Sequence, residues 1–167
     1  MKIFLIGPMG SGKSKIGKLL AERLNLTLID TDKDIETKYE KKIVEIFESE
    51  GEKEFRKKES QFFASLTNLT DTIISTGGGI VESRSNIELL KKEKLVIFLN
   101  ASVQKQHEST KGSKKRPLLN NTDSRKVLEH LYSKRLDLYQ MVAKLELNGD
   151  NLSNEEMVEE IISFINV

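Results

Sequence analysis

The sequence lacks cysteine altogether and contains only two histidines, two prolines and 6% aromatic residues. The absence of cysteine excludes disulfides, thiolate metal sites and a cysteine nucleophile. His107 and His130 are far apart in the sequence and have no cluster of carboxylates near them. We therefore expect both histidines at solvent-exposed helix positions and catalytic groups among the other residue types.

The chain also lacks an excess of charge of one sign and a long hydrophobic run. Its net charge of +1, with 32% charged residues, gives no indication of a nucleic-acid-binding surface. No apolar run approaches the roughly 20 residues that span a membrane, and the apolar N-terminal stretch is too short for a signal peptide. With 167 residues, the chain is expected to form one domain, 1–167, in the cytoplasm, without nucleic-acid or membrane partners.

Short apolar, strand-like runs alternate along the chain with segments of helical periodicity. The predicted strands are 2–6, 26–29, 72–75, 94–99 and 144–147, and the predicted helices are 13–24, 32–38, 43–66, 83–92, 123–142 and 153–165. Buried aliphatic strands separated by helices are typical of a parallel sheet covered on both faces. The pattern predicts a three-layer α/β/α fold around a five-stranded parallel sheet, with ligands at the carboxyl ends of the strands.

The most specific motif follows the first predicted strand and has the sequence Gly7-Pro8-Met9-Gly10-Ser11-Gly12-Lys13-Ser14. It matches the phosphate loop, in which a glycine-rich turn between a strand and a helix presents backbone N–H groups to phosphates. Lys13 supplies a full charge for the β- and γ-phosphates, and Ser14 a hydroxyl for Mg²⁺. Because the motif is in register with both flanking elements, an ordinary glycine-rich turn is a poor alternative. The sequence predicts a binding site for a nucleoside triphosphate.

Two carboxylates, Asp30 and Asp32, follow the second predicted strand. One carboxylate could hold Mg²⁺ or its waters while the other faces an acceptor hydroxyl. Either residue could instead cap the next helix. Beside a phosphate loop, we expect at least one of them to have a functional role.

Two further patterns gain meaning from the phosphate loop. Gly77-Gly78-Gly79 follows the third predicted strand, where consecutive glycines either let a ligand approach the backbone or form a flexible turn. Arg56 and Glu59 are three residues apart on a predicted helix, which favours a surface ion pair or an arginine fork held ready for a carboxylate. The chain has 21 lysines but only six arginines. An arginine retained against that bias can indicate where a bidentate donor is needed.

The segment 101–122 lacks apolar periodicity, is basic, and contains Arg116-Pro117-Leu118-Leu119 near its end. This composition suits a mobile lid that closes over phosphates, excludes water and stabilises the charge of a transition state. A solvated loop is the alternative interpretation. Arg135 follows on a long predicted helix and carries no signal of its own.

The order of these motifs, over essentially the whole chain, resembles the shikimate kinase family within the nucleoside-monophosphate-kinase-like group of phosphate-loop folds. The resemblance runs through GPMGSGKS, DTD, EIFESEGEKEFRKKE, TGGG, KRPLL and RxxLY. It implies ATP-dependent phosphorylation of the 3-hydroxyl of shikimate, a step of chorismate and aromatic amino acid biosynthesis. It also implies a monomer with a substrate-binding helical region at about 31–66 and a mobile lid at about 103–120.

The resemblance further implies a role for each matching residue. The phosphates of ATP would be bound by Gly10, Ser11, Gly12, Lys13, Ser14, Lys15 and Arg116. Shikimate would be bound by Asp32, Arg56, Gly78, Gly79 and Arg135. The catalytic residues would be Lys13, Asp32 and Arg116, with Asp32 holding the acceptor hydroxyl and acting as its base. Mg²⁺ would be held by Ser14 and, partly through water, by Asp30.

The chain departs from the family pattern at three positions. Lys15 stands where Thr or Ser is usual, although its backbone amide can still serve the α-phosphate. Glu40 stands where glycine is frequent, which alters a turn but no implied contact. Ser109 stands where the family typically has a second lid arginine. Because a lysine nearby cannot reproduce a bidentate fork, weaker nucleotide binding or slower turnover is expected.

Two other functions remain open. A gluconate-type or nucleoside-monophosphate kinase would use the same scaffold, but the triple glycine and Phe55-Arg56-x-x-Glu59 argue against it. A nucleotide-binding regulatory protein without transferase activity is the second alternative, and Ser109 is the only feature in its favour.

Overall fold

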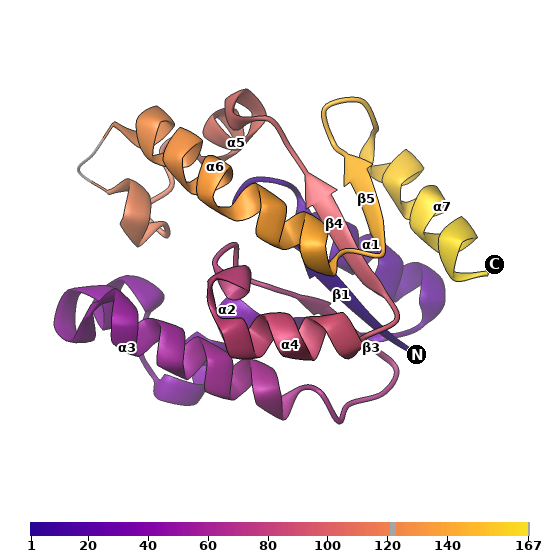
Figure 1. The fold of residues 1–167 in the computed structure, drawn as a ribbon, viewed down its shortest axis with the longest axis horizontal. Coiled ribbons are helices and arrows are strands. Elements are labelled where there is room, and N and C mark those ends of the chain that lie inside the picture. The colour runs from indigo at the N-terminus through magenta and orange to yellow at the C-terminus, as the bar shows by residue number, and fades with distance from the viewer. Residues whose placement is uncertain (121–122, 167) are drawn as a thin grey trace.

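The computed structural model of the chain describes residues 1–120 and 123–166. Its centre is a five-stranded sheet of parallel strands in the order β2-β3-β1-β4-β5 (Figure 1). The strands are β1 (Lys2–Ile6), β2 (Thr27–Asp30), β3 (Thr72–Ser75), β4 (Val96–Asn100) and β5 (Leu145–Asn148). The α-helices are α1 (Lys13–Leu24), α2 (Thr31–Tyr39), α3 (Ile43–Ser65), α4 (Arg84–Lys92), α5 (Val103–Thr110), α6 (Ser124–Val142) and α7 (Asn154–Ile165). Two short 3₁₀ helices are η1 (Ile80–Glu82) and η2 (Pro117–Leu119).

The sheet confirms the predicted strands. β1 and β3 have the predicted ends, and the other three begin one or two residues later than predicted. The parallel register pairs Leu5 with Ser75 and Asp30 with Ser75, so β1, β2 and β3 end at the same edge of the sheet. The segments that follow these strands therefore converge, as expected for the ligand-binding edge of an α/β sheet.

Alternate residues of the sheet enter two separate hydrophobic cores, because successive side chains of a strand point to opposite faces. Ile3 and Leu5 pack in the core that α1 and α7 cover. Phe4 and Ile6 pack in the core on the other face, with residues of α3, α4 and α6. Figure 1 shows α4 and α6 over the near face of the sheet. The predicted three-layer α/β/α architecture is confirmed.

The helix predicted over 43–66 is confirmed in extent by α3, but two features of the helices were not predicted. The helix predicted over 43–66 is interrupted at Gly51, whose φ of 84° and ψ of 166° are not helical. The segment 101–122, which lacks apolar periodicity, contains α5 and η2, and neither was predicted. Helix α5 begins at a capping serine, since the Ser102 hydroxyl accepts a hydrogen bond from the Lys105 amide at 3.2 Å.

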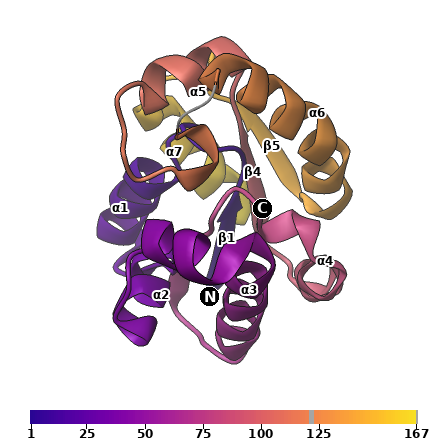
Figure 2. The ribbon, with the colours of Figure 1, turned by 90° about the vertical axis from the view of Figure 1, so that its left-hand side faces the viewer.

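Helices α2 and α3 form a small lobe with its own core of Ile35, Ile46 and Phe55. Figure 2 shows α2 and α3 in the lower part of the view and α5 at the top. The turn between α2 and α3 contains Glu40 in the left-handed conformation, with a φ of 50°. A glycine would adopt this conformation without steric cost, which explains why glycine is frequent at this position, whereas glutamate adopts it at some steric cost.

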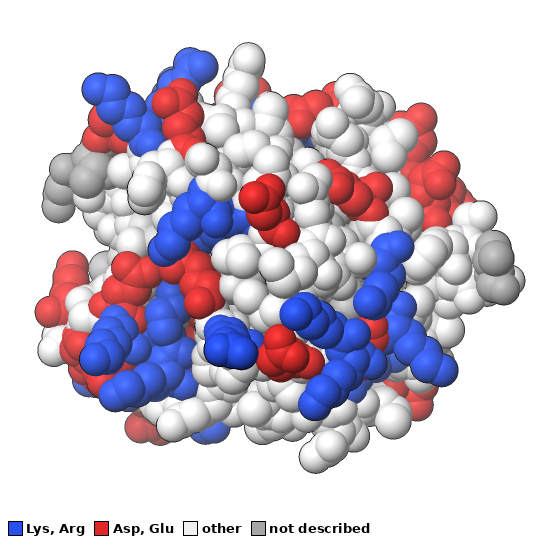
Figure 3. All heavy atoms as spheres, in the orientation of Figure 1, with Lys and Arg blue, Asp and Glu red and all other residues white. Residues whose placement is uncertain are grey.

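The surface carries interleaved acidic and basic side chains on the face drawn in Figure 3. The left edge of that view is indented between the part of the molecule that holds α3 and the part that holds α5 and α6. Among the described residues, no helix combines the length and the apolar character needed to cross a bilayer.

Candidate active site

The loop between β1 and α1 has the backbone expected of a phosphate loop. Gly12 caps α1 with a φ of 90°, a conformation that favours glycine. The Lys13 ammonium group is buried under the loop and donates hydrogen bonds to the carbonyl oxygens of Gly7 at 2.8 Å and Pro8 at 2.7 Å. The Ser11 hydroxyl lies beside it, 3.4 Å from Nζ. The loop therefore fixes the position of the Lys13 ammonium group.

The charge of Lys13 is easily lost in this environment. Burial and the nearby Arg116 lower the pKa of Lys13 to about 7, although Asp32 and Asp30 oppose the shift. A bound phosphate would supply the negative charge that such a buried ammonium group lacks. The position of Lys13 is thus matched to an anionic ligand.

Asp30 makes a helix-capping contact and also a contact with the phosphate loop, so both interpretations of this residue apply. Its side chain caps α2, with Oδ1 accepting from the Lys33 amide at 3.4 Å. Its other oxygen, Oδ2, accepts from the Ser14 hydroxyl at 2.9 Å. The residue is a helix cap and a partner of the phosphate loop at the same time.

The paired oxygens of Ser14 and Asp30 fit Mg²⁺. The ion prefers hard oxygen ligands, takes few of them from protein and keeps several waters beside substrate phosphates. Within residues 1–120 and 123–166, no group of three or more acidic, histidine or cysteine side chains forms a metal cage. A site with one hydroxyl and one carboxylate next to a phosphate loop suits a nucleotide-bound Mg²⁺ ion.

Asp32 lies in the first turn of α2 and approaches a residue from a distant part of the chain. Its Oδ2 lies 3.7 Å from Nη1 of Arg116, which comes from the segment between α5 and α6. Burial raises the pKa of Asp32, and Arg116 opposes that shift. The carboxylate therefore lies in a cleft with two cations, Lys13 and Arg116, close by.

Arg56 is held by carboxylates of its own helix. Its Nη1 donates to Glu59 Oε2 at 2.8 Å, and its Nη2 donates to Glu52 Oε1 at 3.1 Å. Glu59 is 2% exposed, so this pair is not the surface ion pair that was the alternative interpretation. The geometry is that of a fork held in a fixed orientation.

The triple glycine is required by the side chains that lie on it. A Cβ atom on Gly79 would come within 2.2 Å of Nη1 of Arg56, and one on Gly77 within 2.7 Å of Oδ1 of Asp32. The hydroxyl of Tyr139 donates to the Gly78 carbonyl oxygen, and burial raises the pKa of this tyrosine. Since C=O and N–H point in opposite directions in a trans peptide, this bond also orients the Gly79 amide. The glycines therefore allow Arg56 and Asp32 to approach the backbone closely, and the segment is more than a flexible turn.

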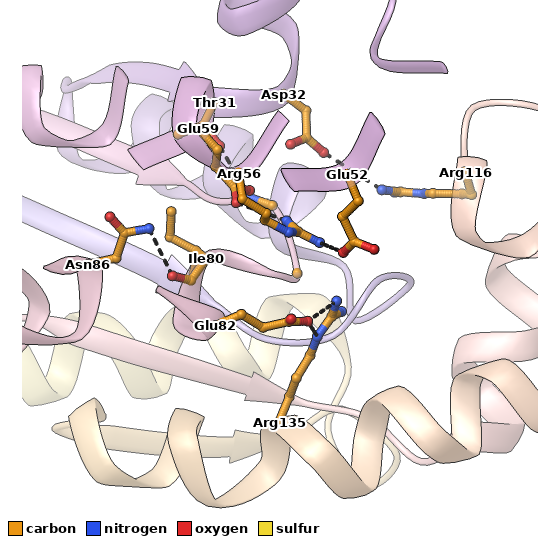
Figure 4. A network of polar contacts seen from close by, with 12 residues as sticks. Thr31, Asp32, Glu52, Arg56, Glu59, Ile80, Glu82, Asn86, Arg116 and Arg135 are labelled. Atoms are coloured by element: carbon orange, nitrogen blue, oxygen red, sulfur yellow. Dashed lines mark hydrogen bonds and ion pairs between the residues drawn. The ribbon is translucent and has the colours of Figure 1, made fainter. Parts of the chain in front are cut away.

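Arg135 is 2% exposed and meets Glu82, a residue that the sequence analysis did not single out. Its Nε donates to Glu82 Oε1 at 2.7 Å, and its Nη2 lies 2.5 Å from the same oxygen. Lys134 donates to the other oxygen of Glu82 at 2.7 Å. Figure 4 shows Arg56, Arg116 and Arg135 reaching from three different segments toward one region beside Asp32.

Two adjoining pockets meet at this region. The first is lined by the residues shared with the second pocket and by Gly10, Gly12, Lys13, Ser14, Lys15, Asp30, Ser75, Thr76 and Ser109. The second is lined by Phe47, Phe55, Arg56, Glu59, Gly79 and Arg135, again with the shared residues. The shared residues are Asp32, Gly77, Gly78 and Arg116. All predicted site residues thus line one composite cavity, with the exception of Ser11, a buried residue of the loop itself.

Ser109 lies against the phosphate loop. A Cβ on Gly10 would be 3.1 Å from the Cβ of Ser109, and Ser109 lines the first pocket. A longer side chain at this position would therefore reach the phosphate pocket from α5. Lys111 and Lys114, the possible substitutes for an arginine here, are exposed.

Known proteins similar to this chain share both its sequence and its fold over almost its full length. The sequence profile of the family named shikimate kinase matches residues 9–166. A protein named shikimate kinase from Histophilus somni (strain 2336) is 44% identical over 164 residues, covering 98% of this chain and 94% of that protein. The solved structure of shikimate kinase from Acinetobacter baumannii in complex with shikimate is 35% identical, with a TM-score of 0.94, and the match covers 98% of this chain and 92% of that one. Shikimate kinase from Bacteroides thetaiotaomicron is 28% identical, with a TM-score of 0.89, and the match covers 100% and 99% of the two chains.

Proposed function

This chain belongs to the shikimate kinase family, and we propose that it transfers the γ-phosphoryl group of ATP to the 3-hydroxyl of shikimate, giving shikimate 3-phosphate and ADP. The observation that carries the proposal is the composite cavity. A phosphate-binding pocket and a pocket with two arginines meet at Asp32 and Arg116. A phosphate donor and a carboxylate-bearing acceptor can therefore be bound side by side.

The first pocket is the ATP site in this proposal. Backbone amides of Gly10–Lys15 surround the phosphates, and the Lys13 ammonium group exchanges its bonds with loop carbonyl oxygens for the β- and γ-phosphates. Ser14 and Asp30 hold Mg²⁺, which neutralises phosphate charge when it is bound. The positions of Gly10, Lys13 and Ser14 along the pocket wall support this assignment.

The second pocket is the shikimate site. Arg56 and Arg135 bind the carboxylate of shikimate, and the amides of Gly78 and Gly79 lie beside it. Phe55 forms part of the wall for the apolar faces of the ring, and its ring centroid is 4.9 Å from that of Phe47. An arginine fork held by Glu59 needs no rearrangement to receive a carboxylate, which favours tight orientation of the acceptor.

The chemistry requires positioning and charge stabilisation more than covalent catalysis. Asp32 accepts a hydrogen bond from the 3-hydroxyl, aligns its oxygen with the γ-phosphorus and takes the proton as the O–P bond forms. The bond from the γ-phosphorus to the bridging oxygen breaks, and ADP leaves with that electron pair. Lys13 and Arg116 stabilise the charge on the transferring group.

The same proposal assigns roles to the larger parts of the chain. The residues 31–66 form the substrate-binding region and the residues 103–120 form a lid that closes on ATP. The 3.7 Å separation of Arg116 from Asp32 supports the assignment of a lid that reaches the site. The kink at Gly51 divides α3 within the proposed substrate-binding region. We propose that the chain works as a monomeric single domain, and in support of this the two pockets need no residue from a second copy.

The first test is an ADP-release assay with MgATP and shikimate, quinate, gluconate or no acceptor, repeated with Arg56→Lys. We expect shikimate-dependent ADP release, and we expect Arg56→Lys to lower kcat/KM for shikimate by about 10- to 100-fold, since a charge-assisted hydrogen bond contributes about 1.5–3 kcal/mol. Lysine retains the positive charge of Arg56 but cannot form the bidentate fork.

The matched control is Arg125→Lys on α6, whose guanidinium is exposed and pairs with Glu129 at 3.4 Å. It should leave kcat/KM unchanged. Turnover with gluconate in place of shikimate would contradict the proposed acceptor, and ATP binding without any acceptor-dependent turnover would favour a regulatory role.

A second test uses the pH dependence of ATP binding. Because the pKa of Lys13 is lowered to about 7, the free protein loses this charge as the pH rises through 7, whereas the ATP complex favours the protonated form. The Kd for MgATP should therefore rise above pH 7 by at most about tenfold per pH unit. Calorimetry at pH 8, where the terminal phosphate is already ionised, should detect uptake of up to about one proton. A Kd that stays constant from pH 7 to 9 would contradict this result.

A further inference from the structure

Glu82 occupies a defined place between the triple glycine and the proposed carboxylate clamp. It is the last residue of η1, which follows Gly79 directly. Its Oε1 accepts from Arg135 at 2.7 Å, and its Oε2 accepts from Lys134 at 2.7 Å. Both carboxylate oxygens are thus engaged by cations of α6 (Figure 4 draws the bonds to Arg135).

We propose that Glu82 is a positioning residue, which holds one edge of the Arg135 guanidinium so that the opposite end is presented to the substrate carboxylate. This inference rests on the proposed function, because it assigns Arg135 to shikimate. Glu82 itself touches neither substrate in the proposal.

Glu82 occupies one edge of the Arg135 guanidinium and leaves the other edge available for a substrate carboxylate. The carboxylate contacts Nε and Nη2 of Arg135. The third nitrogen, Nη1, lies on the side of the glycine backbone, where a Cβ on Gly78 would be 3.6 Å from it. Because Gly78 and Arg135 line the same pocket, the Nη1 end is the one that a substrate carboxylate can reach.

Burial makes this partner necessary. Arg135 is 2% exposed, and a buried cation without a counter-ion is strongly disfavoured. Although burial acts in the opposite direction, Lys134 and Arg135 hold the pKa of Glu82 below its usual value, so the side chain is a carboxylate at neutral pH. Without Glu82, the guanidinium would turn toward water or toward other acceptors and lose its fixed direction.

Repulsion between Glu82 and the substrate carboxylate is the competing effect. Removal of Glu82 would then tighten shikimate binding instead of weakening it. Lys134 offsets this repulsion, because the group of Lys134, Glu82 and Arg135 keeps a net charge of +1. We therefore expect the loss of orientation to dominate.

The test is steady-state kinetics of Glu82→Gln. The amide keeps the shape of the side chain but loses the ion pairs, so KM for shikimate should rise by about tenfold, in the range expected for one charge-assisted hydrogen bond. The kcat should stay within about twofold and KM for ATP should not change, because Glu82 contacts neither the phosphates nor the acceptor hydroxyl. Lys134→Met, which frees only Oε2, should raise KM for shikimate by a smaller factor and gives a second variant if Glu82→Gln folds poorly.

The control is Glu88→Gln on α4, which removes an exposed carboxylate paired with Lys91 at 3.2 Å. It should leave every constant unchanged. In an Arg135→Ala background, Glu82→Gln should have little further effect on KM, because the residue acts through Arg135.

The outcomes separate the two proposals. Wild-type turnover of shikimate with an unchanged or lowered KM for Glu82→Gln would overturn the positioning role and leave the proposed function intact. Equal effects of Glu82→Gln with and without Arg135 would also overturn it. Wild-type protein that binds ATP but does not phosphorylate shikimate would overturn the proposed function, and this inference with it.

Discussion

Arg116→Ala is expected to lower kcat by about 10³-fold, at the low end of the 10³–10⁵ range of arginines that stabilise phosphoryl transfer. Arg116 lies in the proposed lid, lines both pockets and places Nη1 3.7 Å from Asp32. Its charge is thus next to the group that would deprotonate the acceptor and next to the phosphate loop. KM for shikimate should change only a few-fold, because the carboxylate clamp is built from other residues.

The control for Arg116→Ala is Lys111→Ala in the same segment. Lys111 is exposed and lines neither pocket. Its removal tests whether the loss of any positive charge from the lid lowers kcat, and we expect kcat to stay unchanged. Arg116→Lys should recover part of kcat, since it restores charge without the planar fork. If the whole loss for Arg116→Ala were found in KM for ATP, Arg116 would be a ground-state binding residue and the proposed role in the transition state would be wrong.

The sheet was predictable because its strands are short aliphatic runs with clear boundaries. β1 lies between the chain start and a glycine-rich loop, and β3 between a polar turn and three glycines, and both have the predicted ends. Their interior residues, such as Ile73 and Ile74, are fully buried. The order of the strands was not predicted, since it depends on pairing between segments far apart in the sequence.

Helix α5 was missed because polar side chains hold it in place. Its buried positions are Gln106 and Thr110, which give no hydrophobic periodicity. The side-chain amide of Gln106 donates to the Ala101 carbonyl oxygen at 2.8 Å. The Thr110 hydroxyl donates to the backbone carbonyl oxygen of Gln106 at 2.8 Å. The capping serine at Ser102 was the one available signal.

Most of the proposed site residues were predicted because they stand in local motifs, and the spacing of Arg56 and Glu59 placed these two side chains together. Arg135 carried no signal of its own and was named only through the resemblance. Glu52 could have been found in the same way, since it precedes Arg56 by four residues and accepts its second hydrogen bond. Glu82 could not, because its partners Lys134 and Arg135 are more than 50 residues away in the sequence. Contacts of that kind depend on the fold that joins η1 to α6.

Asp32→Asn should have the second large effect, a fall in kcat of about 10²–10⁴-fold, the range for loss of a general base. The amide keeps the size of the carboxylate but cannot take the proton of the acceptor hydroxyl. Burial raises the pKa of Asp32, and the carboxylate is the active form, so wild-type activity should be lost as the pH falls through that raised pKa. A pH profile of kcat/KM should contain this acidic limb for the wild type and lack it for Asp32→Asn.

Asp34→Asn is the control, because Asp34 is in the same turn of α2 but lines neither pocket. A rise in KM for shikimate with unchanged kcat for Asp32→Asn would mean that Asp32 binds the hydroxyl without acting as its base.

The ion pair between Asp32 and Arg116 permits a sharper test. If both residues act on one transition state, the double variant Asp32→Asn with Arg116→Ala should lose less than the product of the two single effects, since groups that act as a unit are not additive. Effects that multiply would show instead that proton removal and charge stabilisation contribute independently to the barrier.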